Sequence, residues 1–334
     1  MAAECIPSPD LPCRANLDLM PPGTPLVMYA VSGLAFLVFC YGFWEMVKVW
    51  RLGKPWKAGD WWTGLKRLVS GLASHRKFRQ DPRPGIMHEW VFLGFVMLFV
   101  GTTIVAIDYD IFEHLFGAKL LEGSKYLAFE AVLDLFGVVF LVGLGYQGWR
   151  RYRERPPQLH STTLPEARGL LGLVDADAFA LQSLFLIGVT GFLVEGLRIR
   201  YQILHDGITY APWSFVGNLV SRLFSGWNEQ QLLAVYPWVW GTHFLLWSTV
   251  LAILPWTKLK HIVTSSLNLY FHDPKRQSRP ELPTPFSLKQ VLESGDSVSG
   301  TVGDGWTVPF QGKCVHARKH PDGWQYGLSV ELQG

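Results

Sequence analysis

The sequence is poor in charge. Of its 334 residues, 17% are charged and 49% are hydrophobic. A soluble domain carries about 25% charged residues, so an ordinary water-soluble fold is disfavoured. We therefore expect much of the chain to lie among membrane lipids, and we expect no nucleic acid as a partner.

Clustered cysteines are lacking as well. The four cysteines are Cys5, Cys13, Cys40 and Cys314, and no two of them have the CxxC spacing. Iron–sulfur and zinc sites use closely spaced cysteines, so we expect the chain to carry neither site by itself. Cys5 and Cys13 fall in one N-terminal segment, and the sequence leaves open whether they pair.

Long apolar runs, by contrast, are abundant. Spanning a bilayer takes about 20 apolar residues, and the runs of that length are 26–49, 89–108, 126–149, 177–197 and 236–256. The first run has no basic segment before it and no cleavage site after it, so we interpret it as a retained helix. The predicted fold class is an all-α integral membrane protein with a five-transmembrane-helix bundle.

Basic residues are distributed unevenly among the connections. The first and third connections hold fifteen Lys and Arg, whereas the second and fourth hold five. Cytoplasmic loops carry the excess of Lys and Arg in membrane proteins. The sequence therefore predicts a multi-pass protein of the inner cell membrane, with its N-terminus outside and its C-terminus in the cytoplasm.

The chain divides into three parts by composition. Residues 1–25 are a proline-rich extracytoplasmic leader, 26–272 form the membrane domain, and 273–334 form a cytoplasmic linker with a small β-rich tail. In the first loop, "GDWWTGLKRLVSGLAS" is either an interfacial helix or a solvated basic loop. On the outer side, "APWSFVGNLVSRLFSG" is predicted to be another amphipathic segment.

Three of the ten histidines, unlike the others, lie in or at the ends of the predicted membrane helices, where they are candidates for a functional role. In the predicted topology, His88 opens the second membrane helix at the inner face, and His261 follows the fifth helix at that face. Two histidines on different helices at one depth are what axial ligation of a haem needs. A histidine at a helix end also commonly caps a carbonyl or meets a headgroup, and this alternative applies to each histidine alone.

His243 lies inside the fifth run. It precedes His261 by 18 residues, which is about five turns of one helix, so both would share a face about 27 Å apart. Pro255 interrupts that stretch and loosens the inference. Ionisable residues within a membrane are costly to bury, so His243 is a functional candidate.

Around these histidines the sequence resembles a known family. "GIMHEWVFLGF" and "GTHFLLWSTVLAILPWTKLKHIVTSSLN" are similar to the cytochrome b family of the respiratory nitrate reductase gamma subunit. Within it, "GTTIVAIDYDIF" and "TGFLVEGLRI" resemble the membrane domain of heterodisulfide-reductase-like iron–sulfur proteins, including ETF:quinone oxidoreductases. The resemblance covers about residues 26–275.

The resemblance implies a cofactor and its ligands. It makes His88 and His261 the axial ligands of an inner haem b, and it makes His243 one ligand of an outer haem. Leu98 occupies the place of the other outer ligand, so one haem is expected and a second lacks a ligand. It also implies that the iron–sulfur carrier, absent from this chain, is a separate subunit.

Quinone chemistry moves protons as well as electrons, so it needs a protonatable group near an apolar cleft. Asp134, within the third run, is either at such a quinone site or hydrogen-bonded to a neighbouring helix; Glu130 lies one turn nearer the surface. Glu195 and Arg198 can pair on one helix face. His243, if it binds no metal, is an alternative proton carrier.

The sequence thus predicts a haem b-containing membrane subunit. It would pass electrons between the quinone pool and a cytoplasmic iron–sulfur (heterodisulfide-reductase-like) subunit or electron-transfer flavoprotein. The alternative is a non-redox membrane anchor that lost haem and only docks a redox partner. A small transporter is disfavoured because no inverted repeat is visible. The direction of electron flow cannot be predicted from the sequence.

Overall fold

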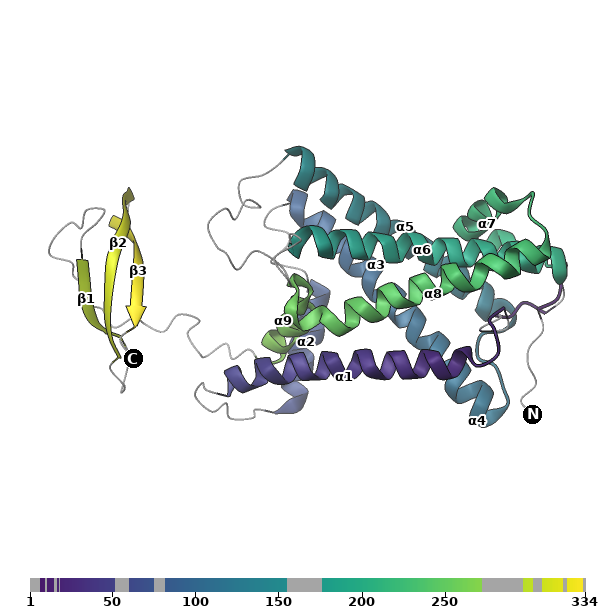
Figure 1. Ribbon diagram of the computed structural model, residues 1–334, viewed down its shortest axis with the longest axis horizontal. Helices are drawn as coiled ribbons and strands as arrows, with labels where there is room; N and C mark the ends of the chain where they lie inside the picture. Colours follow the sequence, from purple (N-terminus) through teal and green to yellow (C-terminus); the bar gives the residue numbers. More distant parts are fainter. Residues whose placement is uncertain are drawn as a thin grey trace. The chain divides into compact units, whose positions relative to one another are not determined.

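The computed structural model describes residues 7–9, 11–14, 17, 19–51, 60–74, 82–154, 176–271, 297–302, 308–320 and 323–332 (Figure 1). Cys5 and the predicted proline linker lie outside the described residues. The chain divides into two compact units, Met1–His272 and Asp273–Gly334. Each unit is described by itself.

Five helices of the first unit are long and apolar enough to cross a membrane. They are α1 (Thr24–Trp50), α3 (Pro82–Ile107), α5 (Gly123–Trp149), α6 (Ala176–His205) and α8 (Glu229–Ile253). The predicted five-helix membrane fold is confirmed. These helices leave large apolar side chains such as Leu37 and Trp238 uncovered, as expected of surfaces that face lipid.

The long helices pack in the order α3, α5, α6, α8 and α1. Close approach is clearest between α3 and α5, where a Cβ atom at Gly94 would lie 2.6 Å from the Cβ of Phe140. Small residues permit such approach in membranes, where apolar burial alone does not drive helices together. On its other side α3 reaches α8 through large side chains, for example Phe99 and Trp247, whose ring centroids are 6.5 Å apart.

Shorter helices cover the two ends of the bundle. One end carries α2 (Trp61–Ser74) and α9 (His261–Phe271), which pack together. The other end carries a π-helical extension of α3, η2 (Asp108–Glu113), the short α4 (His114–Phe116), and η7 (Ala211–Trp213), α7 (Phe215–Ser221) and η8 (Arg222–Phe224). Of the two alternatives left open for the first loop, the structure has the helix, and the segment predicted to be amphipathic at 211–226 is helical over 211–213 and 215–224. We call these the histidine end and the carboxylate end, for the groups described below.

The N-terminal segment is fixed to the carboxylate end. The amide of Gly123 donates to the carbonyl of Pro12 at 2.7 Å, and the backbone of Cys13 forms an isolated antiparallel β-bridge with that of Glu122. Cys13 is fully buried and disulfide-bonded. These contacts bring the leader against the start of α5.

The second unit contains three antiparallel strands in sequence order. They are β1 (Ser297–Val302), β2 (Val308–His320) and β3 (Gly323–Leu332). The pairing of β2 with β3 shifts in register between Cys314 and His316. Neighbouring strands are joined by short connections, as in a meander.

Candidate functional sites

The structure brings His88 and His261 together. His88 lies in the second turn of α3, and His261 is the first residue of α9. Their ring centroids are 6.4 Å apart and the ring planes are inclined by 54°. We call this pair the histidine site.

The hydrogen bond of His261 defines which nitrogen can bind a ligand. Its Nδ1 lies 2.6 Å from the carbonyl oxygen of Lys258. A carbonyl only accepts, so in the neutral imidazole Nδ1 carries the proton and Nε2 keeps its lone pair. Ligating histidines commonly have this arrangement, in which the second nitrogen donates to a carbonyl.

The separation within the histidine site suits one metal between two imidazoles. A metal–imidazole bond is about 2 Å long, and a ring nitrogen lies about 1 Å from its ring centre, so two such rings have centres about 6 Å apart. Among the described residues no group of three or more His, Cys, Asp or Glu could hold a metal ion. The spacing of the two rings is compatible with axial ligation, which needs two imidazoles.

The chain reaches His261 through a break in the fifth membrane segment. Helix α8 ends at Ile253, and two short 3₁₀ turns follow, η9 (Leu254–Trp256) and η10 (Lys258–Lys260). Between them Thr257 is extended, and its hydroxyl caps η10. The prediction of one continuous helix carrying both His243 and His261 is wrong, because Pro255 lacks the amide proton a helix needs there.

His243 is held against α6. Its Nδ1 lies 3.0 Å from the hydroxyl of Thr190, and a Cβ atom at Gly191 would lie 3.4 Å from its Cε1. Leu98, which stands where an outer haem would need a ligand, packs against an apolar cluster that includes Phe140 and Val250. Hence the described contacts of His243 are to α6 and include no second imidazole.

The carboxylates at the other end form one network. Glu130 accepts hydrogen bonds from Arg14 at 2.9 Å, Arg198 at 2.8 Å and Ser214 at 2.9 Å. Glu130 and Arg198 are both almost fully buried. A buried charge needs such partners, because desolvation is costly.

Asp134 and Glu195 complete this network. Asp134 accepts the backbone amides of Val216 and Gly217 at the start of α7, and a carboxyl oxygen of Glu195 lies 3.8 Å from a guanidinium nitrogen of Arg198. We call Glu130, Asp134 and Glu195 the carboxylate cluster.

The carboxylate cluster is closed by α7. A Cβ atom at Gly217 would lie 2.6 Å from the Cδ of Glu195, so this close approach requires glycine. No pattern in the sequence connected Glu130 and Asp134 on one helix with the Glu195–Arg198 pair on another. The structure joins them and adds Arg14, Ser214 and the α7 amides, which no sequence spacing indicated because they are distant along the chain.

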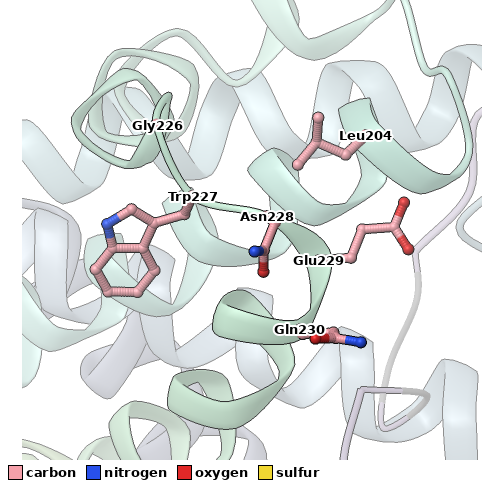
Figure 2. Close-up of a pocket in the computed structure, with 6 residues that line it drawn as sticks. All are labelled: Leu204, Gly226, Trp227, Asn228, Glu229 and Gln230. Atoms are coloured by element: carbon pink, nitrogen blue, oxygen red, sulfur yellow. The ribbon is translucent and has the colours of Figure 1, made fainter.

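A cavity of about 530 Å³ opens near the start of α8. It is lined by Leu204, Gly226, Trp227, Asn228, Glu229 and Gln230. Figure 2 shows the polar side chains of this lining pointing in different directions rather than toward one point. It contains neither the histidines nor the carboxylates considered above, so we assign it no role.

Comparison with known proteins links the chain to oxidoreductases. It is 28% identical over 258 residues to an "EtfAB:quinone oxidoreductase" of Syntrophomonas wolfei, covering 74% of this chain and 33% of that protein. It is 26% identical over 202 residues to the "Probable iron-sulfur-binding oxidoreductase FadF" of Bacillus subtilis, covering 59% of this chain and 25% of that protein. The chain thus spans a third or less of these relatives.

No family model and no solved structure matches the chain. Neither relative is named as a nitrate reductase gamma subunit, so membership of that family stays a prediction.

Proposed function

We propose that this protein is a membrane electron-transfer subunit that holds haem b between His88 and His261. It would pass electrons between the membrane quinone pool and an iron–sulfur subunit or electron-transfer flavoprotein at the cytoplasmic face. The observation that carries the proposal is the juxtaposition of the two imidazoles at 6.4 Å. The names of the two relatives, one a quinone oxidoreductase and one an iron–sulfur-binding oxidoreductase, support the same assignment.

The chain's own residues prepare this site. The backbone carbonyl of Lys258 accepts a hydrogen bond from Nδ1 of His261. This bond fixes the ring and leaves Nε2 for a ligand. Deeper in the bundle, Phe99 and Trp247 bring α3 and α8 into contact through their rings. A haem bound there would supply one-electron transfer.

We further propose that the histidine end faces the cytoplasm. The distribution of Lys and Arg among the loops supports this orientation. The disulfide at Cys13 agrees with it, because disulfides persist in oxidising compartments and Cys13 lies beside Glu122 at the carboxylate end.

We assign to the carboxylate cluster and His243 the transfer of protons to and from the quinone. Asp134 is held by the α7 amides and Glu195 by Arg198 within this network, and a carboxyl group can take up or release a proton. On α6, Gly191 lies against His243 one turn before Glu195. His243 of α8 therefore contacts α6 about one helical turn from Glu195 of the cluster.

The test is a reduced-minus-oxidised visible spectrum of the purified protein, with haem counted per chain. We expect one haem per chain in the wild type, lost in His88→Ala and in His261→Ala. His205→Ala is the matched control, because His205 is exposed and pairs with Glu229 at the other end. His243→Ala keeps the haem unless a second one is bound.

A wild-type protein that is colourless when made in haem-replete cells overturns the proposal. If that colourless protein still binds an iron–sulfur or flavoprotein partner, the chain is a membrane anchor instead.

A further inference from the structure

Helix α9 is packed on two sides. It begins with His261, none of its 11 residues is buried, and Ile262 and Val263 pack against the apolar cluster that includes Val250. The helix packed against it is α2, which lies beside it at the histidine end (Figure 1). The position of His261 therefore depends in part on how α9 is seated on α2.

Two glycines of α2 form that seat. A Cβ atom at Gly64 would lie 2.8 Å from the Cε2 of Tyr270, and one at Gly71 would lie 2.9 Å from the Cδ2 of Leu269. Real Cβ atoms do not approach other carbons so closely, so the Tyr270 ring and the Leu269 methyl group would have to move, either by rotation of the side chain or together with α9. Gly64 and Gly71 are seven residues apart, which is about two helical turns, so they share one face of α2.

The other side of α2 is apolar and uncovered. Trp61, Trp62 and Val69 are 65%, 49% and 58% exposed, and the ammonium of Lys66 lies 5.7 Å from the centre of a Trp62 ring. Tryptophan with adjacent lysine is typical of a helix lying at the lipid headgroups. Lipid contact on one side and α9 on the other would fix α2 in place.

We propose that Gly64 and Gly71 are positioning residues for His261. By admitting Tyr270 and Leu269, they set the tilt of α9 and hence the place of the imidazole at its first residue. Because α9 is a short rigid helix of about 16 Å, a side chain inserted at its far end moves the near end as well. The importance of that movement for a cofactor rests on the function proposed above.

The experiment substitutes valine at each glycine. Gly64→Val and Gly71→Val are expected to shift the haem α-band and midpoint potential, or to lower the haem content, relative to Gly145→Val. Gly145 is the matched control because it is also in a helix and a Cβ atom added there would have nothing within 4 Å. A second substitution that removes the obstacle, Gly64→Val with Tyr270→Ala or Gly71→Val with Leu269→Ala, should restore the wild-type spectrum.

A second measurement does not depend on haem. With Cys40→Ser and Cys314→Ser as background, His88→Cys and His261→Cys are joined by a short bis-maleimide, and the cross-linking yield is compared with and without Gly64→Val. We expect the yield to fall several-fold with Gly64→Val and to be unchanged with Gly145→Val. Equal yields, or spectra of the glycine variants that match the control, overturn the inference. A colourless wild type whose cross-linking still responds to Gly64→Val overturns only the haem proposal.

Discussion

The two ends of the bundle treat their ionisable groups in opposite ways. At the carboxylate end, Glu130 receives three hydrogen bonds and Asp134 two backbone amides, all from elements far apart along the chain. At the histidine end, His261 is exposed and uses one nitrogen on a neighbouring carbonyl. One end holds its charge in a closed network, whereas under the proposed function the other presents an imidazole nitrogen to a ligand.

This difference distinguishes two roles that a polar residue can have in a membrane protein: stabilising the fold or binding a ligand. A group whose bonds are all made within the protein stabilises the fold, and its removal is felt as lost stability. A ligating group keeps a lone pair for something else, so its removal is felt as lost binding. Substitutions at each end test this distinction, beginning with the largest effect.

Arg198 is the centre of the closed network. Its guanidinium donates to Tyr126 at 2.7 Å and to Glu130 at 2.8 Å. Arg198→Met should lower the free energy of unfolding by about 3–5 kcal/mol, because it leaves a buried carboxylate without its principal partner. Thermal unfolding in detergent measures the loss. Arg222→Met, at an exposed arginine, should cost no more than about 0.5 kcal/mol; equal losses would contradict the network.

The contacts of the two glutamates predict a difference between them. Glu195→Gln should change stability by less than about 1 kcal/mol, because Glu195 lies 3.8 Å from Arg198, beyond hydrogen-bond distance. Glu130→Gln should cost about 1–3 kcal/mol, because it removes the charge that two guanidinium groups share. The same unfolding measurement compares them. Equal costs would contradict the central place of Glu130 in the network.

The sequence predicts the helices better than the sites because the two depend on different information. Apolar runs of membrane length form helices wherever they occur, and their number and order hold in the structure. The continuity of the fifth segment does not hold, since a single proline redirects the chain at 254–260.

The carboxylate cluster could be predicted only in part. Asp134 and Glu130 are recognisable as costly residues in an apolar run. Their partners Arg14 and Ser214 lie 116 and 84 positions from Glu130 in the chain, and no local pattern connects residues so distant. Likewise Gly64 is an ordinary helical glycine until Tyr270 is seen against it.

The smallest expected effect is a pH response confined to the histidine end. Asp60 caps α2: its side chain accepts from the Thr63 hydroxyl at 2.9 Å and from the amides of Trp62 and Thr63. The bonds from the Thr63 hydroxyl and the Trp62 amide lower the pKa of Asp60 below its ordinary value of 3.8. The cap therefore stabilises the folded helix fully above that value, and it is lost as the pH falls through the lowered pKa.

Hydrogen exchange of the α2 amides, expressed as protection relative to the unstructured chain, measures this loss. Protection should decrease on acidification in the wild type but not in Asp60→Asn, whose amide oxygen still caps the helix and does not titrate in this range. The amides of Val216 and Gly217, which donate to Asp134 at the carboxylate end, should keep their protection over the same range if their network is closed to solvent. Loss at both ends together would mean that acid unfolds the bundle as one unit, and the contrast between an open and a closed end would not hold.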